Sequence, residues 1–565
     1  MGQFILAPEN RTDRLESFLA QCDRAGVQTV HSHVSDGLSV ALSSRVDGSM
    51  PEWQEDGGGA SFTVGSRSPG NRGAFAWAQS NQEAAPGAWR LGADRAGNMQ
   101  IFYLPDGNTV SSSFMGCAAL AGDLTLDIGA CYEFVWNGCV FGEQTLFKEI
   151  RRLSGGDALA VSQSSLELER AEENAAHILQ DAPEQADNLE DMARQEVEKL
   201  RTAFSDLSQI HNGRVRSALS GGYDSRLILA LLLDQSLRPE LFVYGDDTDA
   251  DVRIANQVAR AFDLDLDHRR KTPAHETSAE FAERVDRDLI AFDGRRDEGI
   301  FNSGADYPDR KARHAKGAVV LNGGLGEIYR NFFYLPDRGF TPDDVISAFF
   351  ARFDPGAMTA LFEERAYRAR MKRRFASALG HSECLESLTR PEIEALYPLV
   401  RGRDWTARET SLSQRFGPFL TPFLDLDVIQ GTPNLPIEAK SFGRLEGRMI
   451  ALLNPMVASI PGANGFPLFG RVPPLFYRLR HLASSRRPIA LRRKSYRVQH
   501  RLRARRPRPA YLANERLSQV MDTDFPYMRQ LFRLENIRDW TVFNRVATLE
   551  LLAQRLDVRW PEENS

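Results

Sequence analysis

Six consecutive residues, Ser220-Gly221-Gly222-Tyr223-Asp224-Ser225, combine the groups that proteins use to hold a polyphosphate. Glycines let a backbone approach a ligand closely, and a following helix would present unpaired N–H groups and the positive end of its dipole. The two serines add hydroxyl donors, whereas Asp224 would repel a phosphate unless it held Mg²⁺. The string therefore predicts a site for ATP with Mg²⁺, although the same residue types also occur in ordinary capped turns.

The segments around this string should position it at the edge of a sheet. From Val215 the chain alternates apolar strand-like runs (216–219, 241–244 and 319–321), glycine turns and helical patterns (226–234 and 251–262). This alternation is typical of a parallel sheet with helices on both faces, and such sheets bind ligands at the carboxyl ends of their strands. We therefore predict an α/β fold with the nucleotide at that edge.

The remaining sequence predicts a β-rich region before this sheet and a helical region after it. Residues 1 to about 165 contain short apolar runs between turn clusters, a helical pattern spans 187–205, and the chain is mainly helical beyond about 340. A length of 565 residues favours two domains, for which we expect the bounds 1–185 and 186–565.

Location and redox state follow from composition. No apolar run approaches the roughly 20 residues of a membrane span, and the first residues lack the pattern of a secretory signal. The five cysteines form no CxxC pair, which favours reduced thiols and a cytoplasmic protein. Without a cysteine pair, an RNA-modifying enzyme of the sulfur-transfer type is disfavoured.

The Ser220 to Ser225 string resembles the SGGxDS loop of the PP-loop ATP-pyrophosphatases, and further strings are similar to the asparagine synthetases. Phe242-Val243-Tyr244-Gly245 with the helix from Asp251 resembles the second strand and helix of that family. Val320 to Ile328 resembles its LSGEGADEI loop, and Pro422 to Asp425 resembles its PFLD signature. In the N-terminal region 94–97, 111–113 and 145–153 match the end of a glutaminase-like domain. The resemblance covers residues 70 to 460, with unmatched stretches between.

The resemblance implies a fold, an activity and a set of site residues. It implies an Ntn-hydrolase-like N-terminal domain, a PP-loop domain of the adenine nucleotide α-hydrolase-like type, and a helical C-terminal tail. ATP would be cleaved between its α- and β-phosphates to activate a carboxylate as an adenylate, with Asp224 as a catalytic Mg²⁺ ligand. The implied ATP-binding residues are Leu219, Ser220, Gly221, Gly222, Tyr223, Ser225, Tyr244, Gly245, Asn322 and Gly323.

The sequence also departs from the family. Class II glutaminase domains use Cys at position 2 as nucleophile, and here this residue is Gly2; the RGPD and NGEIYN strings are absent too. We therefore expect no glutamine hydrolysis, as in the β-lactam synthetases and lasso-peptide cyclases, which trap the adenylate with an amine of the substrate. In the third loop the second Mg²⁺-binding Asp falls on Gly326, and the adjacent Glu327 is our candidate for the displaced catalytic metal ligand. Gly324 stands at the position implicated in activating the amine, and no replacement base is evident.

An Arg-rich segment, residues 471–508, has no match in the family. It holds 14 Lys/Arg and no Asp/Glu in a chain of net charge −6. It could bind an anionic ligand such as a lipid-linked sugar phosphate, a nucleic acid or an acidic membrane surface, or form a solvated helical face. Lys494 and Lys440 are candidates for a lysine that reaches the departing pyrophosphate.

We thus predict an ATP- and Mg²⁺-dependent amide-forming ligase that acts on a small-molecule, peptide or glycan carboxylate and that can form a homodimer. One alternative is a glutamine-dependent asparagine synthetase or a sugar-acid amidotransferase. Another is an inactive scaffold that binds an anionic partner. Intact Ser220 to Ser225 argues against the scaffold, whereas Gly324 and Gly326 argue for it.

Overall fold

The computed structural model of the chain describes residues 2–35, 37–56, 59–68, 71–80, 88–171, 177–180, 188–205, 207, 213–270, 276–314, 317–470, 473–503 and 507–561. The predicted domain boundary at 185/186 lies outside the described residues, as do 471–472 and 504–506 of the Arg-rich segment. Among the described residues, no helix is long and apolar enough to cross a membrane.

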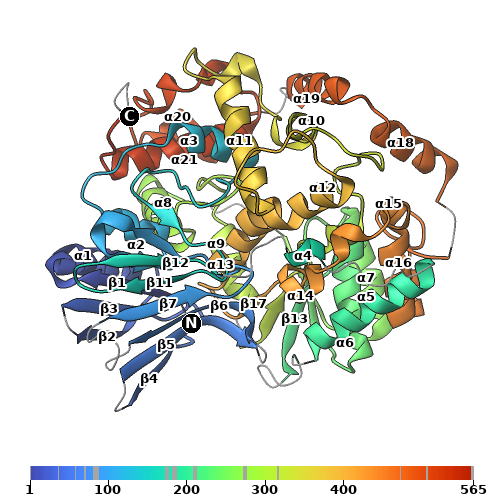
Figure 1. Cartoon of the computed structure of the whole chain (residues 1–565), viewed down its shortest axis with the longest axis horizontal. Helices are drawn as coiled ribbons and strands as arrows, with labels where there is room; N and C mark the ends of the chain where they lie inside the picture. The colour runs from blue at the N-terminus through green and yellow to red at the C-terminus, as the bar shows by residue number, and fades with distance from the viewer. Residues whose placement is uncertain are drawn as a thin grey trace.

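The N-terminal lobe contains two stacked six-stranded sheets, drawn from blue to teal in Figure 1. The first sheet has the order β10-β8-β9-β1-β3-β2, with β1 Gln3–Pro8, β2 Thr29–Ser35, β3 Leu38–Ser43, β8 Phe102–Leu104, β9 Thr109–Ser111 and β10 Arg151–Arg152. The second has the order β12-β11-β7-β6-β5-β4, with β4 Glu52–Asp56, β5 Gly59–Ser68, β6 Arg72–Ser80, β7 Trp89–Ala93, β11 Ala158–Val161 and β12 Leu166–Glu169. All neighbouring strands whose register is resolved in these sheets run antiparallel.

Strand β1 is buried on both faces because it lies between two layers. Phe4 and Leu6 join the apolar layer between the two sheets, whereas Ile5 and Ala7 face the helices on the other side. This alternation follows from the two-residue period of a strand. The covering helices are α1 Thr12–Arg24, α2 Phe114–Leu120 and α3 Ile128–Asn137.

A five-stranded sheet, all of whose neighbouring strands run parallel, forms the second part of the molecule. Its order is β15-β14-β13-β16-β17, so the chain reverses direction across the sheet between β13 and β16. The strands are β13 Val215–Ala218, β14 Glu240–Tyr244, β15 Leu266–Arg269, β16 Val319–Leu321 and β17 Phe419–Leu420. The predicted α/β class and the three predicted strands of this region are confirmed. In open α/β sheets the crevice at such a reversal is where ligands bind.

Helix α6 (Tyr223–Asp234) follows β13 directly and is apolar almost all round, which is typical of a helix buried between layers. It packs against the sheet and beneath α5 (Leu189–Phe204) and α16 (Arg444–Leu453). Helix α7 (Ala250–Phe262) covers β14 and β15. The predicted helices at 187–205, 226–234 and 251–262 are therefore confirmed, with small shifts at their ends.

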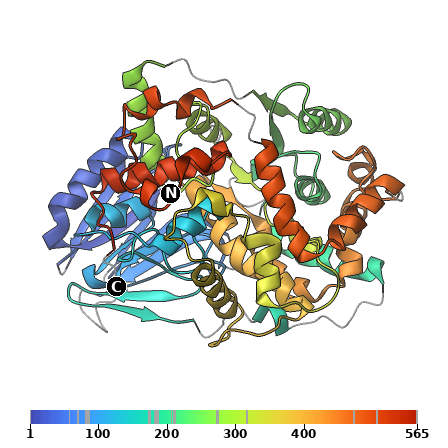
Figure 2. The same ribbon diagram turned by 90° about the horizontal axis from the view of Figure 1, so that it is seen from above.

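The C-terminal region is mainly helical, as predicted, and it covers both other parts. Figure 2 shows its last helix lying across the N-terminal lobe, where α21 contacts α3. One apolar core accordingly runs from β1 to Val558. The helices are α10 Pro342–Val345, α11 Glu364–Ala378, α12 Arg390–Leu396, α13 Ala407–Ser413, α14 Leu426–Ile429, α15 Ile437–Lys440, α17 Pro455–Ser459, α18 Leu475–Ser485, α19 Ile489–Arg503, α20 Asn514–Leu517 and α21 Trp540–Arg555, with a π-helical segment at Tyr397–Thr406.

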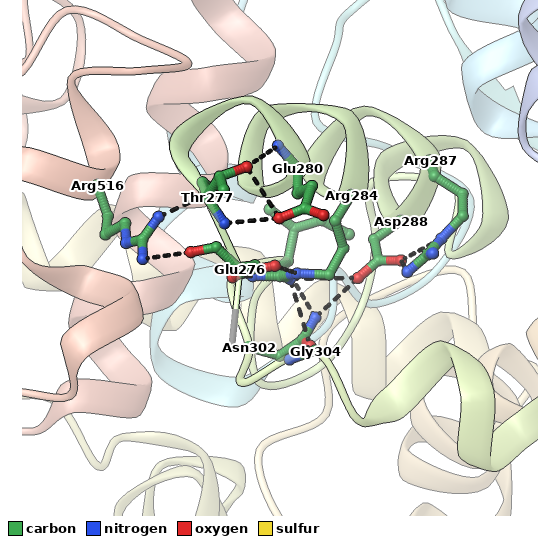
Figure 3. Close-up of polar contacts among 10 residues, drawn as sticks. Glu276, Thr277, Glu280, Arg284, Arg287, Asp288, Asn302, Gly304 and Arg516 are labelled. Atoms are coloured by element: carbon green, nitrogen blue, oxygen red, sulfur yellow. Dashed lines mark hydrogen bonds and ion pairs between the residues drawn. The ribbon is translucent and has the colours of Figure 1, made fainter. Parts of the chain in front are cut away.

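The connection between β15 and β16 is held by a network of charged side chains on α8 (Ser278–Ala291), shown in Figure 3. Arg284 binds the Glu276 carboxylate with both Nε and Nη2, at 2.8 Å each. Asp288 accepts hydrogen bonds from Asn302 and Arg287, and Arg516 from the C-terminal region donates to the carbonyl of Glu276. Because these groups are buried or half-buried, losing one partner would leave a buried charge unpaired.

Asp293, in the same connection, joins the parallel-sheet region to the N-terminal lobe. Its fully buried carboxylate accepts hydrogen bonds from Ser113 Oγ at 2.7 Å and from the backbone N–H of Phe114 at 2.8 Å. It also forms ion pairs with Arg295 and Arg415 at 3.0 and 2.9 Å. Although burial opposes ionisation, these partners hold the pKa of Asp293 below its usual value. The junction between the two parts is therefore fixed by charge as well as by apolar contact.

Candidate functional site

The predicted phosphate loop lies between the carboxyl end of β13 and the first turn of α6. Ser225 folds back onto its beginning: its Oγ accepts a hydrogen bond from Ser220 N at 3.0 Å and lies 2.9 Å from Ser220 Oγ. The two serines therefore fix the shape of the turn. Gly222 is the N-cap of α6, and the first N–H groups of the helix donate no hydrogen bond to a side chain of this residue.

Gly221 is tightly enclosed on the other side of the loop. A Cβ at this position would lie 2.6 Å from Ile254 Cδ1 of α7 and 3.0 Å from the backbone nitrogen of Ala463. The Gly221 N–H donates to Asp251 Oδ1 at 2.8 Å, and its carbonyl accepts from Ala463 N at 3.2 Å. A glycine is needed here by close packing, and its N–H is already bound to a carboxylate.

The third glycine loop, residues 322–326, lies against the first turn of α6. A Cβ on Gly323 would be 3.1–3.2 Å from backbone atoms of Asp224 and Ser225, and a Cβ on Gly326 would be 2.3 Å from Asp224 Oδ1. Asn322 stabilises this turn by accepting a hydrogen bond from Gly324 N at 3.2 Å. The two loops on either side of the strand reversal therefore meet at Asp224, and no side chain fits at Gly326 while Asp224 keeps its place.

Arg330 gathers three carboxylates at this point. Its Nη2 donates to both oxygens of Asp224 at 2.7 Å and lies 3.5 Å from Glu327 Oε1. Its Nε is 3.2 Å from Oε2 of Glu446, a fully buried residue of α16. Neither oxygen of Glu446 accepts a hydrogen bond with good geometry. One guanidinium thus faces three acidic groups, and the ionised form of Glu446 is left unsatisfied.

The pKa values of these groups reflect that imbalance. Burial raises the pKa of Asp224; the Arg330 charge opposes this rise and Glu327 adds to it. Burial and the neighbouring Asp224 raise the pKa of Glu446 well above its usual value, whereas the Arg330 charge opposes this rise. Burial alone would lower the pKa of Arg330, but the charges of Asp224, Glu446 and Glu327 outweigh it. The cluster therefore favours an additional positive charge, supplied by a proton or by a cation.

Glu327 has a second partner, Tyr397, from the π-helical segment. The Tyr397 hydroxyl donates to Glu327 Oε2 at 2.7 Å, and its ring stacks on Phe332 with centroids 3.9 Å apart. Burial and the Glu327 charge raise the pKa of Tyr397 well above its usual value. The predicted second metal ligand is therefore oriented from one side by a neutral phenol and from the other by Arg330.

Three of the expected ATP-binding residues, Leu219, Tyr244 and Gly245, lie at or just beyond the ends of neighbouring strands. Leu219 is buried, with its N–H bound to Phe242 O at 3.0 Å. Tyr244 lies at the end of β14, where the Arg313 guanidinium sits 4.6 Å above its ring and donates to its hydroxyl at 2.7 Å. Gly245 has a φ of 142°, which lets the chain turn towards α7. The structure thus brings this set to the same sheet edge as the phosphate loop.

The two candidate lysines do not join the cluster. Lys440 is buried and donates to Glu394 Oε2 at 2.8 Å, within a group that also contains Arg390. Lys494 is exposed on α19. Arg330, which the sequence did not single out, is the cation paired with Asp224.

The donor set is compatible with Mg²⁺ bound together with a polyphosphate. No group of three or more His, Cys, Asp or Glu that could hold a metal by itself occurs in the part of the chain that the structure describes. Mg²⁺, however, is commonly held by one or two carboxylates together with substrate phosphates. Asp224 and Glu327 contact the same Arg330 nitrogen, and the cluster carries more acidic than basic groups. These two carboxylates therefore fit the role that the sequence predicted.

In the N-terminal lobe there is no room for a side chain at Gly2, the position where the sequence lacks a cysteine. A Cβ on Gly2 would lie 2.1 Å from the carbonyl oxygen of Ser44 and 2.6 Å from that of Ser43. The Gly2 N–H is bound to Ser43 O at 3.1 Å. A cysteine side chain cannot be added here without moving the strand.

No family model and no curated protein matches the chain. The resemblance to the asparagine synthetases therefore rests on the short sequence strings alone.

Several residues of the site were not found from the sequence. Glu446 and Tyr397 lie far along the chain in the helical region, where no spacing relates them to the loop. Arg330 lies three residues beyond Glu327, and only this i, i+3 spacing could have suggested their ion pair. Asp251 was noted as the start of a helix, but its bond to the loop depends on how α7 packs.

Proposed function

We propose that the chain is an ATP-dependent amide-forming ligase with a PP-loop domain and a degenerate glutaminase-like N-terminal domain. The observation that carries the proposal is the position of Ser220 to Ser225. This string connects the central strand of a parallel sheet to a helix N-terminus, beside the strand reversal where such sheets bind ligands. The second and third glycine turns lie at the same edge.

In this proposal the N-terminal turn of α6 and the serine hydroxyls bind the phosphates, and adenine lies near Leu219 and Tyr244. Asp224 and Glu327 would hold Mg²⁺, which supplies charge compensation for the departing pyrophosphate. Arg330 offers a guanidinium at the same place and can offset negative charge on the substrate. A carboxylate of the substrate attacks the α-phosphorus, and an amine then displaces AMP.

The N-terminal lobe supports the amine-trapping form of the reaction. The enclosed Gly2 leaves no room for a nucleophilic side chain, so ammonia from glutamine has no source in this lobe. The chain would then use an amine of its substrate, in the cytoplasm, where its free cysteines stay reduced.

A non-catalytic scaffold is the second candidate, and two contacts favour it. Arg330 neutralises Asp224 from within the protein, and Asp251 uses the N–H of Gly221. A scaffold would need neither the Asp224 carboxylate nor the Gly221 N–H to be free for binding a nucleotide. For a ligase, both contacts must rearrange or be shared when ATP binds.

Isotope exchange between pyrophosphate and ATP distinguishes the two candidates. With Mg²⁺ and a panel of small-molecule, peptide and sugar carboxylates, a ligase should show exchange that depends on one class of carboxylate, and it should release AMP. Formation of ADP and phosphate instead would overturn the proposed cleavage between the α- and β-phosphates. A scaffold should give neither product.

A further inference from the structure

Helix α18 presents its apolar side chains to solvent, at the upper right edge of the molecule in Figure 1. The exposed fractions are 68 % for Leu475, 78 % for Phe476, 55 % for Leu479 and 38 % for Leu482. At 100° per residue these four side chains fall on one stripe of the helix. In an ordinary surface helix such a stripe faces the core, so α18 has the reverse orientation.

The opposite face of α18 is anchored, which fixes the stripe outward. The Tyr477 ring lies 5.1 Å from Phe466, and the His481 ring lies 4.1 Å from Phe442 and 5.3 Å from Tyr334. From α19, Arg492 holds the pair of helices by donating to the carbonyl of Phe333 at 2.9 Å.

Positive charge borders the stripe. Arg478 and Arg480 are exposed on either side of it, and the outer face of α19 adds Leu491, Lys494 and Val498. No Asp or Glu occurs between residues 471 and 508. The surface therefore combines protruding apolar side chains with charge of one sign.

We propose that the α18 surface, defined by Leu475, Phe476, Leu479, Leu482, Arg478 and Arg480, docks the protein on an anionic lipid membrane. Helices of this kind insert their apolar stripe at the boundary of headgroups and acyl chains while basic residues contact anionic lipid. A symmetric contact between two copies would place this positive surface against itself. A nucleic acid would use the arginines but would leave the three leucines without a partner.

Vesicle flotation tests this inference with the full chain and without nucleotide, so its outcome is independent of the ligase activity. The protein should float with phosphatidylcholine vesicles containing phosphatidylglycerol, and binding to pure phosphatidylcholine should be weaker. The triple variant L475E/F476E/L479E should lower the partition coefficient about 100-fold or more, because three large apolar side chains no longer enter the lipid. R478Q/R480Q should weaken binding to the anionic vesicles specifically.

A matched control is the variant V34E/M50E/L361E, whose wild-type side chains are 57, 58 and 53 % exposed elsewhere on the molecule. It should float like the wild type. Failure of the wild type to bind anionic vesicles, or equal loss of binding in both triple variants, overturns the inference. So does a wild-type dimer that only L475E/F476E/L479E dissociates, or tight binding to single-stranded RNA without binding to vesicles.

Discussion

At the scale of single residues, the site is defined by the charge balance around Asp224. Its carboxylate, on the first turn of α6, accepts hydrogen bonds from Arg330, and two further acids, Glu327 and Glu446, lie beside the same guanidinium. The Arg330 contact alone would make Asp224 a structural ion pair. The surplus of carboxylates and the enclosing glycine loops are what favour a cation–polyphosphate site at this point.

Asp224→Asn should abolish ATP turnover and leave the fold intact. The amide keeps the shape of the side chain but loses the charge that a hard cation requires, and loss of one such group costs on the order of 10²-fold or more in rate. Pyrophosphate release together with circular dichroism measures both effects. Near-normal release by this variant would show that Asp224 serves only as a partner of Arg330.

Glu327→Gln should raise the Mg²⁺ concentration needed for activity and lower the maximal rate, because a neutral amide coordinates Mg²⁺ weakly. Tyr397→Phe is the matched comparison: it removes the hydroxyl that orients Glu327 but keeps the carboxylate charge, so its shift should be smaller. The rate of ATP turnover is measured as a function of Mg²⁺ concentration for the wild type, Glu327→Gln and Tyr397→Phe. Superimposable curves for Glu327→Gln and the wild type would mean that Glu327 is not a metal ligand.

At the scale of elements, the sequence predicted the strands, helices and turns that form the sheet edge, because apolar runs and glycine turns are local signals. It did not predict what reaches this edge from elsewhere. Glu446 on α16 and Tyr397 arrive through packing of the helical region, and no local pattern encodes that packing. The reason for Gly326 likewise became evident only once Asp224 was seen to fill the space where its Cβ would lie.

Substitutions of the adjacent glycines Gly221 and Gly222 test whether the turn before α6 binds phosphate or is an ordinary capped turn. Gly222→Ala adds a Cβ whose nearest contact is Ser220 Oγ at 3.4 Å, so stability should be almost unchanged while nucleotide binding falls. Gly221→Ala forces a Cβ against Ile254 and Ala463 and should lower the free energy of unfolding by about 1–3 kcal/mol. Denaturant unfolding measures the stability of the two variants, and nucleotide titration measures their affinity for ATP. Unimpaired ATP binding by Gly222→Ala would argue for a simple capped turn.

At the scale of the whole molecule, the N-terminal lobe is joined to the rest by buried charge and by a shared apolar core. Asp293 binds two backbone N–H groups of α2, and α21 packs on α3. A lobe held in this way stabilises the parallel-sheet part of the molecule through these contacts.

Gly2→Cys should therefore not create a glutaminase. The added side chain meets the carbonyl oxygens of Ser43 and Ser44, so the variant should lose about 1–3 kcal/mol of stability. Release of glutamate from glutamine, measured against a heat-treated control, should stay at background for both proteins. Glutamate release by the wild type would contradict the proposed amine-trapping reaction, and a fully stable Gly2→Cys would contradict the steric account.

Titration calorimetry with α,β-methylene-ATP tests the central claim, that Ser220 to Ser225 with Asp224 forms a Mg²⁺–ATP site, most directly. This analogue cannot be cleaved between the α- and β-phosphates, so no carboxylate substrate is needed. The account predicts saturable binding of one nucleotide per chain in the presence of Mg²⁺, at least about tenfold weaker binding in EDTA, and a similar loss in Asp224→Asn. Absence of saturable binding by the wild type at millimolar nucleotide, or binding that neither EDTA nor Asp224→Asn weakens, would contradict it.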